Sequence, residues 1–594
     1  MNGAEAVSVG SRPAPLGGRR VCAAFVLFLA LPIALRAASL DHGLPGGYVP
    51  DAHIVRNALG MARDKNPVPE VGQYSTYPNL LPYALLPVYV AYYARGLAAG
   101  DWTDAREFGD HVFAHPEGPH LIARWLVMLL GALTPLVVFR AAREAGLERG
   151  AWVAGWLVTT GLLHTQLSMH ERPWAPMVLF MALAAWMAIR YTNEPRTKWL
   201  GWSGAFAGLA FATHQAGLPS LGLCGLAWLL ALGGWSGPAL RARLVRGATC
   251  VAIFGLVGIL IGHPYLLVHG RTPEAAVVGG AGLVDAGGVS IGGMSFLLGF
   301  DAATVVEFAR ATLAYDPVVL IMGLLGLGAA IRRRATRPVA LWSVLWLVFF
   351  LLYKGTHTRY FLPTTVFFAI PAGLFAERLS RVRAGRLALV PLMAFPLVQS
   401  VRLTWLLGQT DTRADAEELL YRLPLGSRTV VDRYGPDVHL SLEALDRLQE
   451  VRQLQGSGLY SRERHRRRSL NLPPGSLPDG FDTGVDVVPL EDLLEFDDRT
   501  GAVHVRKGLE SLGEDPREVL AGLGITHLLL VDRDLSGEHP LAALVRGLDP
   551  IDVVDPSRHG TTSEAYLPTE MKFPLTALWR VDRPGPRLRL YDFQ

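Results

Sequence analysis

The chain has 594 residues, of which 50% are hydrophobic and only 18% are charged. Soluble domains carry about a quarter charged residues, so this composition argues against a soluble protein. The formal net charge of +4 is too small to indicate a nucleic-acid partner. The three cysteines, Cys22, Cys224 and Cys250, all lie in apolar segments, which argues against a disulfide framework.

The first apolar segment, 21–38, follows a short N-terminal segment, 1–20, that ends in two arginines. A basic segment, an apolar run and the small residues after it also form the pattern of a cleaved signal peptide. We favour an uncleaved signal anchor, because an anchor delivers the next loop to the far side of the membrane. Residues 1–20 would then be a cytoplasmic tail.

Ten further apolar segments are long enough to cross a bilayer as helices, which takes about 20 residues or slightly fewer. They cover about 120–139, 151–168, 174–190, 199–213, 218–234, 247–263, 315–331, 339–353, 360–376 and 387–407. In hydrocarbon, the backbone polar groups of such segments are satisfied only within helices or closed barrels. The sequence therefore predicts an all-α polytopic membrane domain over 21–407, with about eleven transmembrane helices.

The short segments between these spans show a strong bias in Arg and Lys. Basic clusters precede the first span and follow the second, fourth, sixth, eighth and tenth spans. Membrane proteins retain such residues on the cytoplasmic side. Because all the clusters fall on one side of an eleven-span arrangement, we expect a multi-pass protein of the bacterial inner (plasma) membrane with a cytoplasmic N-terminus.

Two loops are expected on the outer side. The longer one, 39–119, is rich in Pro, Tyr and Gly, and its apolar stretch Leu80–Tyr93 contains two prolines. We interpret that stretch as an interfacial helix rather than a span. The second, Gly270–Gly293, has the composition of a flexible glycine-rich loop.

The C-terminal segment, 408–594, has a different composition from the rest of the chain. Its charge density rises and the long apolar runs stop. Ala414–Leu423 has the pattern of an amphipathic helix, and Arg428–Asp432 and His527–Val531 have the pattern of short strands. We predict a soluble, extracytoplasmic α/β domain.

Four cationic or ionisable residues depart from the charge bias, since they fall at the outer ends of spans: Arg172, His214, Lys354 and Arg359. Ionisable groups at such depth are functional candidates, and several cations together suit a lipid phosphate. The alternative for each is a side chain that extends to lipid phosphates at the interface.

Asp51 lies about a dozen residues beyond the first span, in the outer loop. A carboxylate at the membrane surface is suited to act as a general base. Its position after Pro50 equally suits the N-cap of a helix over Ala52–Leu59. Spacing alone leaves both interpretations open.

Several short motifs occur in a characteristic order between about 20 and 440. They are Pro50-Asp51-Ala52, Tyr77-Pro78-Asn79-Leu80-Leu81-Pro82-Tyr83, the arginine-initiated span at 123–146, Leu163-His164-Thr165-Gln166-Leu167-Ser168, Ala212-Thr213-His214-Gln215, Gly262-His263-Pro264-Tyr265-Leu266 and Thr358-Arg359-Tyr360-Phe361-Leu362-Pro363. In these motifs the chain resembles the GT-C glycosyltransferases, specifically the protein-mannosyltransferase type (glycosyltransferase family 39) and the related lipid A aminoarabinose transferases.

The resemblance implies an inverting glycosyltransferase that uses a polyprenyl-phosphate-linked sugar, with a protein, lipid or glycan as the acceptor. Asp51 would be the catalytic base. Arg359, Lys354, His214 and Arg172 would bind the donor phosphate. Substrate-binding candidates are Tyr77, His170, Glu171 and Tyr360, although each tyrosine also suits a plain interfacial position.

Three departures from the family pattern bear on substrate and metal use. Ala52 replaces a second acidic residue, Trp174 stands where relatives place an aspartate that Glu171 would replace, and His214 stands where relatives often have lysine. His164, His170 and Glu171 are candidates for metal ligation, but they lack a zinc-ligand spacing. We therefore predict no metal site and no cofactor, with a divalent metal at these residues as the alternative.

Two other function classes compete with this one. A lipid-linked glycan flippase or other transporter would be favoured by inverted repeats with matching broken helices, and no such repeat is visible. A phosphoethanolamine- or acyl-type transferase would need a metal or nucleophile signature, which the sequence lacks.

Overall fold

The computed structural model describes residues 17–46, 53–69, 77–231, 237–268, 289–291, 294–296, 302–352, 358–471, 484–497, 502–532, 540–557 and 573–593. The chain forms two compact units. The first, which we call the helical unit, comprises 1–40, 51–94 and 119–404. The second, the sheet unit, comprises 41–50, 95–118 and 405–594. Part of the long loop after the first span thus belongs with the C-terminal segment.

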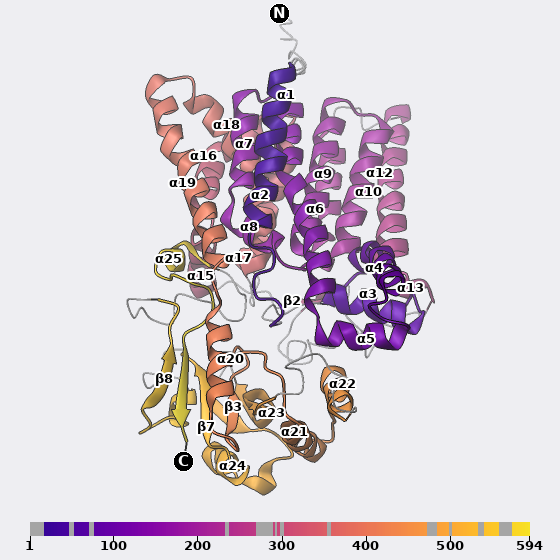
Figure 1. Ribbon diagram of the computed structural model, residues 1–594. Coiled ribbons are helices and arrows are strands. Elements are labelled where there is room, and N and C mark those ends of the chain that lie inside the picture. The colour runs from indigo at the N-terminus through magenta and orange to yellow at the C-terminus, as the bar shows by residue number, and fades with distance from the viewer. Residues whose placement is uncertain are drawn as a thin grey trace, which may run out of the picture. The chain divides into compact units, whose positions relative to one another are not determined.

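The helical unit is built from apolar helices (Figure 1). In chain order they are α1 (Gly18–Phe25), η1 (Val26–Ala30), α2 (Leu31–Ala37), α3 (His53–Asp64), α4 (Leu80–Ala99), α6 (Glu117–Glu144), α7 (Arg149–Thr159), α8 (Leu162–Ser168), α9 (Trp174–Asn193), α10 (Thr197–Thr213), η2 (Gln215–Gly217), α11 (Ser220–Leu230), α12 (Gly237–Val257), η3 (Gly258–Gly262), α13 (Tyr265–Val268), α15 (Ala302–Leu313), α16 (Pro317–Arg332), α17 (Arg337–Leu352), η5 (Thr358–Phe361), α18 (Leu362–Leu379) and α19 (Arg383–Leu407).

Six of the described helical segments are long and apolar enough to cross a membrane, and three shorter apolar helices accompany them. The polytopic membrane protein expected from the sequence is therefore confirmed, while the number of eleven spans stays a prediction. The interfacial stretch is helical, as α4. Most of the predicted glycine-rich loop lies outside the described residues. Its described end, Val289–Ile291, is strand β1, which pairs antiparallel with β2 (Met294–Phe296).

The prediction of one continuous helix over 151–168 is wrong. The structure has two helices there, α7 and α8, which separate around Gly161. The carboxylate of Asp316, far along the chain, accepts hydrogen bonds from the backbone N–H groups of Leu162 at 2.7 Å and Leu163 at 3.3 Å. A side chain that satisfies these N–H groups stabilises a second helix start inside the apolar run.

Close helix contacts centre on α18, which is the most buried of the candidate spans. A Cβ atom added to Gly326 of α16 would lie 1.9 Å from the carbonyl oxygen of Pro371. One added to Gly150 of α7 would lie 2.3 Å from the carbonyl oxygen of Gly373. Small residues allow helices in a bilayer to approach closely, so these glycines fix α18 between its neighbours.

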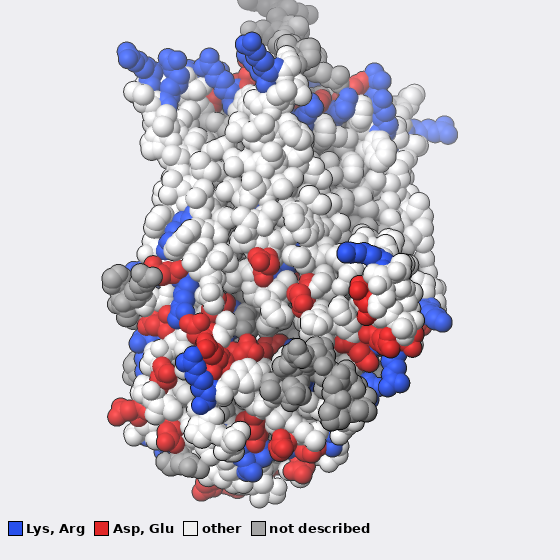
Figure 2. Space-filling view, viewed as in Figure 1, with Lys and Arg blue, Asp and Glu red and all other residues white. Residues whose placement is uncertain are grey.

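Charge is distributed unevenly over the helical unit. Figure 2 shows Lys and Arg side chains gathered at the end of this unit where the chain's N-terminus and α1 lie, next to a belt almost free of charge. Basic residues also close α9 and α18, at Arg190 and Arg378. The basic clusters predicted to be cytoplasmic therefore lie at one end of the helices.

We expect reporter fusions to follow this asymmetry. Truncations after Glu144 and Ser380, joined to paired cytoplasmic and extracytoplasmic reporters, should report the cytoplasm. Truncations after Gly60 and Gln455 should report the outside, since an odd number of spans precedes each. A cytoplasmic signal after Gln455 would contradict the eleven-span arrangement.

The sheet unit contains a five-stranded mixed sheet with the order β4-β3-β7-β9-β8. Strand β3 is parallel to β4 and β7, whereas β9 is antiparallel to β7 and β8. The elements are α5 (Ala105–Ala114), α20 (Thr412–Arg422), β3 (Arg428–Val431), α21 (Leu442–Leu454), α22 (Ser461–Leu470), β4 (Asp486–Pro489), α23 (Leu490–Leu493), β5 (Leu494–Asp497), β6 (Ala502–Val505), η6 (Glu510–Leu512), α24 (Pro516–Gly522), β7 (His527–Val531), η7 (Pro540–Ala543), β8 (Pro550–Val554), α25 (Leu575–Leu578) and β9 (Leu588–Asp592). The helix and both strands that the sequence predicts here are present as α20, β3 and β7.

Both faces of this sheet are covered by apolar side chains. On one face, Val430 and Leu528 pack with Leu448 of α21 and Leu520 of α24. On the other face, their strand neighbours, such as Val431, pack with residues of α20. Successive side chains of a strand point to opposite faces of the sheet. Because both faces are covered here, apolar residues follow one another along these strands, and the sequence shows continuous apolar runs.

Candidate functional site

The predicted base Asp51 and the predicted phosphate ligand Lys354 lie outside the described residues. Helix α3 begins at His53, two residues after Asp51. Nδ1 of His53 lies 2.6 Å from a guanidinium nitrogen of Arg56, one turn further along the helix.

A row of rings starts at that histidine. The ring of Tyr77 lies 5.2 Å from that of His53 and 5.1 Å from that of His214. The ring of His214 lies 4.3 Å from that of Trp174, which in turn lies 5.1 Å from the ring of Tyr360. The structure thus brings together three predicted residues, Tyr77, His214 and Tyr360, from separate parts of the helical unit. We call these five residues the aromatic row.

The aromatic row lies at the ends of helices that are opposite to the basic clusters. Trp174 opens α9, whose last turn carries Arg190. Tyr360 immediately precedes α18, whose last turn carries Arg378. A helix of 20 residues such as α9 is about 30 Å long, which matches the hydrocarbon thickness of a bilayer. The row and the basic clusters are therefore separated by about one membrane thickness.

Arg359 adds a positive charge at the end of the row. Its guanidinium carbon lies 5.6 Å from the centre of the Tyr360 ring. Within the described ranges, its buried Nε has no hydrogen-bond partner. A buried donor without a partner is costly, and an anion is the natural partner of a guanidinium. Arg359 is therefore well suited to hold a phosphate.

His214 has a fixed tautomer in this arrangement. The side chain is 4% exposed, and its Nδ1 accepts a hydrogen bond of 3.0 Å from the backbone N–H of Ala216. An imidazole nitrogen that accepts leaves the proton of the neutral ring on the other nitrogen. Nε2 of His214 therefore carries the ring hydrogen.

Glu171 belongs to a second, buried group in the turn between α8 and α9. Its Oε2 accepts a hydrogen bond of 2.6 Å from Nε of Arg124, and its Oε1 lies 2.7 Å from Nδ1 of His120. Glu171 and Arg124 are each 1% exposed. Burial alone would raise the pKa of Glu171, but the charge of Arg124 and the bond with His120 hold it well below its usual range. Both oxygens of this predicted substrate ligand are thus engaged by the protein.

Sequence reasoning assigned no role to Arg124 or His120. Arg124 also donates a hydrogen bond of 2.9 Å to the carbonyl oxygen of Leu40, so it ties the end of the first span to α6. A signal was available, because Arg124 is a cation at the outer end of a span, the same criterion that selected Arg172. Its pairing with Glu171 was not visible without the fold.

The two neighbours of Glu171 are buried as well. Arg172 is 1% exposed, and its backbone N–H donates to the carbonyl oxygen of His170 at 2.7 Å. The side chain of Arg172 therefore lies inside the protein rather than extending to lipid. On sequence, His164 is a candidate metal ligand together with His170 and Glu171. Its Nδ1 instead lies 3.0 Å from a guanidinium nitrogen of Arg36. Among the described residues, no three His, Cys, Asp or Glu side chains form a metal-binding group.

Comparison with protein families matches part of the helical unit. Residues 117–263, which run from the start of α6 to just after η3, match the model of the dolichyl-phosphate-mannose-protein mannosyltransferases. No curated protein matches the sequence. The resemblance to the protein-mannosyltransferase type, predicted from the motifs, is therefore confirmed for residues 117–263.

Solved structures give weaker likenesses. ArnT from Cupriavidus metallidurans, bound to undecaprenyl phosphate, has 17% identity and a TM-score of 0.44 over 69% of this chain and 67% of that one. An oligosaccharyltransferase from Archaeoglobus fulgidus, tethered with an acceptor peptide, has 11% identity and a TM-score of 0.42 over 87% and 70%. Arabinofuranosyltransferase AftD from Mycobacteria has 14% identity and a TM-score of 0.39, over 98% of this chain and 42% of that one. At these low scores the likenesses establish neither substrate nor partner for this chain.

Proposed function

We propose that the chain is an inverting glycosyltransferase that moves a sugar from a polyprenyl-phosphate-linked donor to a protein, lipid or glycan acceptor at the outer face of the membrane. The family match supports this class, since its description names a mannose carried on a polyprenyl phosphate. The observation that carries the proposal is the position of Arg359 beside the aromatic row, at the end of the helices opposite to the basic clusters.

The chemistry requires a base and an anion site but no general acid. A base removes the proton of an acceptor hydroxyl, whose oxygen then attacks the anomeric carbon as the bond to phosphate breaks on the opposite face. The sugar passes through an oxocarbenium-like state and its configuration inverts. Asp51 is the proposed base. The leaving phosphate is already acidic, so cations rather than a proton must stabilise its growing charge.

The described residues offer groups for that anion. Arg359 has a buried Nε without a partner within the described ranges, and His214 presents Nε2–H. Lys354 and Arg172 remain proposed helpers. The rings of Tyr77, Trp174 and Tyr360 offer apolar surfaces for the isoprenoid or the sugar, with the tyrosine hydroxyl groups available for hydrogen bonds.

The function is tested by transfer of a labelled sugar in liposomes that contain the purified full chain. Polyprenyl-phosphate donors carrying mannose, glucose, galactose, arabinose or aminoarabinose would be supplied with membrane extract as a source of acceptors. Transfer of at least one sugar, with inverted anomeric configuration in the product, is expected. Movement of intact donor between leaflets without any transfer would instead identify a flippase.

Arg359→Ala should lower turnover by about 10²–10³-fold, as does the loss of one preorganised donor to a developing oxyanion. Arg359→Lys should recover only part of the activity, because an ammonium group lacks the planar fork that holds two phosphate oxygens. The measurement is turnover and donor affinity with the labelled donor. Arg378→Lys, at the basic end of α18, is the matched control and should be active. Full activity of Arg359→Lys with unchanged donor affinity would remove Arg359 from the site.

A further inference from the structure

A cavity of about 490 Å³ lies within the sheet unit. It is lined by residues of the segments after β3 and β4, including Asp437 and Glu491, and by residues of α5 and α22. It therefore lies at the carboxyl ends of two neighbouring parallel strands, where α/β sheets commonly bind ligands. Its volume falls in the range of small-molecule sites, about 300–1,000 Å³. The proposed transfer reaction does not use this cavity.

The lining is rich in charge but balanced. Arginine and carboxylate side chains are equally numerous in it. Arg462 pairs with Asp437, and Nε of Arg433 lies 3.3 Å from a carboxylate oxygen of Glu491. A phosphate or other strong anion would have to compete with these carboxylates. The balance instead favours an uncharged ligand that both donates and accepts hydrogen bonds, as a hydroxyl group does.

His465 is held in a defined orientation at the edge of this cavity. Its ring stacks on Phe113 of α5, with centroids 4.3 Å apart and planes inclined by 19°. Its Nδ1 lies 3.3 Å from a carboxylate oxygen of Asp110. Burial lowers the pKa of His465, an effect that Asp110 opposes and Arg468 reinforces. The ring is therefore neutral at pH 7 and adds no net charge to the lining.

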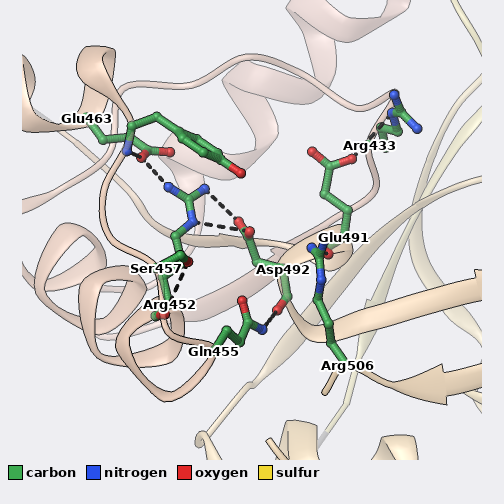
Figure 3. Close-up of polar contacts among 9 residues, drawn as sticks. Arg433, Arg452, Gln455, Ser457, Glu463, Glu491, Asp492 and Arg506 are labelled. Carbon is green, nitrogen blue, oxygen red and sulfur yellow. Dashed lines mark hydrogen bonds and ion pairs between the residues drawn. The ribbon is translucent and has the colours of Figure 1, made fainter. Parts of the chain in front are cut away.

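The wall formed by α21, α22 and α23 is fixed by Arg452 (Figure 3). Its guanidinium donates to both oxygens of Asp492, at 3.2 and 2.9 Å, and also to Glu463. Gln455 donates to the backbone carbonyl of Asp492 at 2.6 Å. These contacts hold the backbone beside Glu491 and the side chain of Glu463 in place. Less conformational entropy is therefore lost when a ligand binds to them.

Aromatic surface completes the lining. The rings of Tyr434 and Tyr460 both line the cavity, and Tyr460 is 64% exposed. The guanidinium carbon of Arg452 lies 4.0 Å from the centre of the Tyr460 ring, and this cation–π contact holds the ring in position. A tyrosine provides an apolar face and a hydroxyl group together. Planar Arg–carboxylate pairs beside such faces match a sugar ring, which has hydroxyl groups at its edge and C–H groups on its face.

We propose that the cavity at the carboxyl ends of β3 and β4 binds a neutral saccharide through the Arg462–Asp437 and Arg433–Glu491 pairs. The site is separate from the proposed transfer site, and its ligand is bound rather than consumed there.

The test uses the full chain in nanodiscs and saturation-transfer NMR with the methyl glycosides of mannose, glucose, galactose, arabinose and N-acetylglucosamine. Inorganic phosphate is the anionic probe. At least one glycoside should bind, and Asp437→Ala and Glu491→Ala should each weaken its affinity about ten-fold or more, as expected for hydrogen bonds to charged groups. Asp446→Ala is the matched control, because Asp446 also pairs with an arginine of α22, Arg467, yet does not line the cavity.

Each other result is decisive against the proposal. Absence of binding by every glycoside, preference for phosphate, or unchanged affinity in both cavity variants would overturn it. Arg359→Ala distinguishes the two sites, since it should lower turnover by about 10²–10³-fold and leave this binding intact. Binding that Arg359→Ala removes and Asp437→Ala retains would belong to the transfer site. Thermal unfolding of each variant shows whether it is folded. If Asp437→Ala or Glu491→Ala is unfolded, the affinity of the other variant tests the proposal.

Discussion

Asp51→Asn should lower sugar transfer by about 10²–10⁴-fold, the usual contribution of a positioned general base. Asparagine keeps the size of the side chain and caps a helix as well as aspartate does. Helix α3, which begins at His53, should therefore remain intact, and so should expression and donor affinity. The measurement is single-turnover transfer from a labelled donor with enzyme in excess.

The same helix offers a matched control for this variant. Asp64, at the other end of α3, forms an ion pair of 2.7 Å with its neighbour Arg63. Asp64→Asn should transfer sugar at the normal rate. If Asp51→Asn did the same, Asp51 would be a helix cap and the base would have to be sought elsewhere.

Glu171→Gln should reduce the free energy of unfolding by about 3–5 kcal/mol, because it leaves the guanidinium of Arg124 buried without a counter-charge. Both side chains are 1% exposed, so water does not replace the lost partner. The measurement is thermal or denaturant unfolding of the purified protein in detergent. Glu117→Gln, at the start of α6 where the side chain is 45% exposed, should have almost no effect.

A double variant separates a structural role of Glu171 from substrate binding. Arg124→Met combined with Glu171→Leu removes both charges and should recover much of the lost stability. If the recovered protein also transfers sugar, Glu171 acts only through packing, whereas a stable but inactive protein would restore it as a substrate ligand.

The pH dependence of this pair has a defined sign. The pKa of folded Glu171 lies well below its usual range, owing to Arg124 and His120 against the opposing effect of burial. A depressed carboxyl pKa contributes stability above the unfolded value and loses it as pH falls through the folded value. The contribution of Glu171 should therefore persist at neutral pH and disappear only in strong acid.

The sequence predicts the helices well because the bilayer imposes a simple rule of length and hydropathy. It also selects Tyr77, His214, Arg359 and Tyr360, which the structure brings to one end of the helical unit. His214 and Arg359 stand out because they are ionisable residues at outer span ends, a position that follows from counting spans. Tyr77 and Tyr360 come from the motifs that the chain shares with the family.

The remaining features depend on contacts between distant segments. The break at Gly161 depends on Asp316, and the burial of Glu171 depends on Arg124 and His120. Neither partner is near in sequence, and hydropathy has no information about pairing. The grouping of 41–50 and 95–118 with the C-terminal segment is of the same kind, since composition placed them with the outer loop of the membrane domain.

The strand order of the sheet unit has a consequence for biosynthesis. Strand β9, the last element described, pairs with both β7 and β8 and so lies inside the sheet. The sheet is incomplete until Leu588–Asp592 has been synthesised. Segments 41–50 and 95–118 are made long before their partners, and such non-local pairing is slow. These early segments therefore remain without their packing partners while the intervening residues are synthesised.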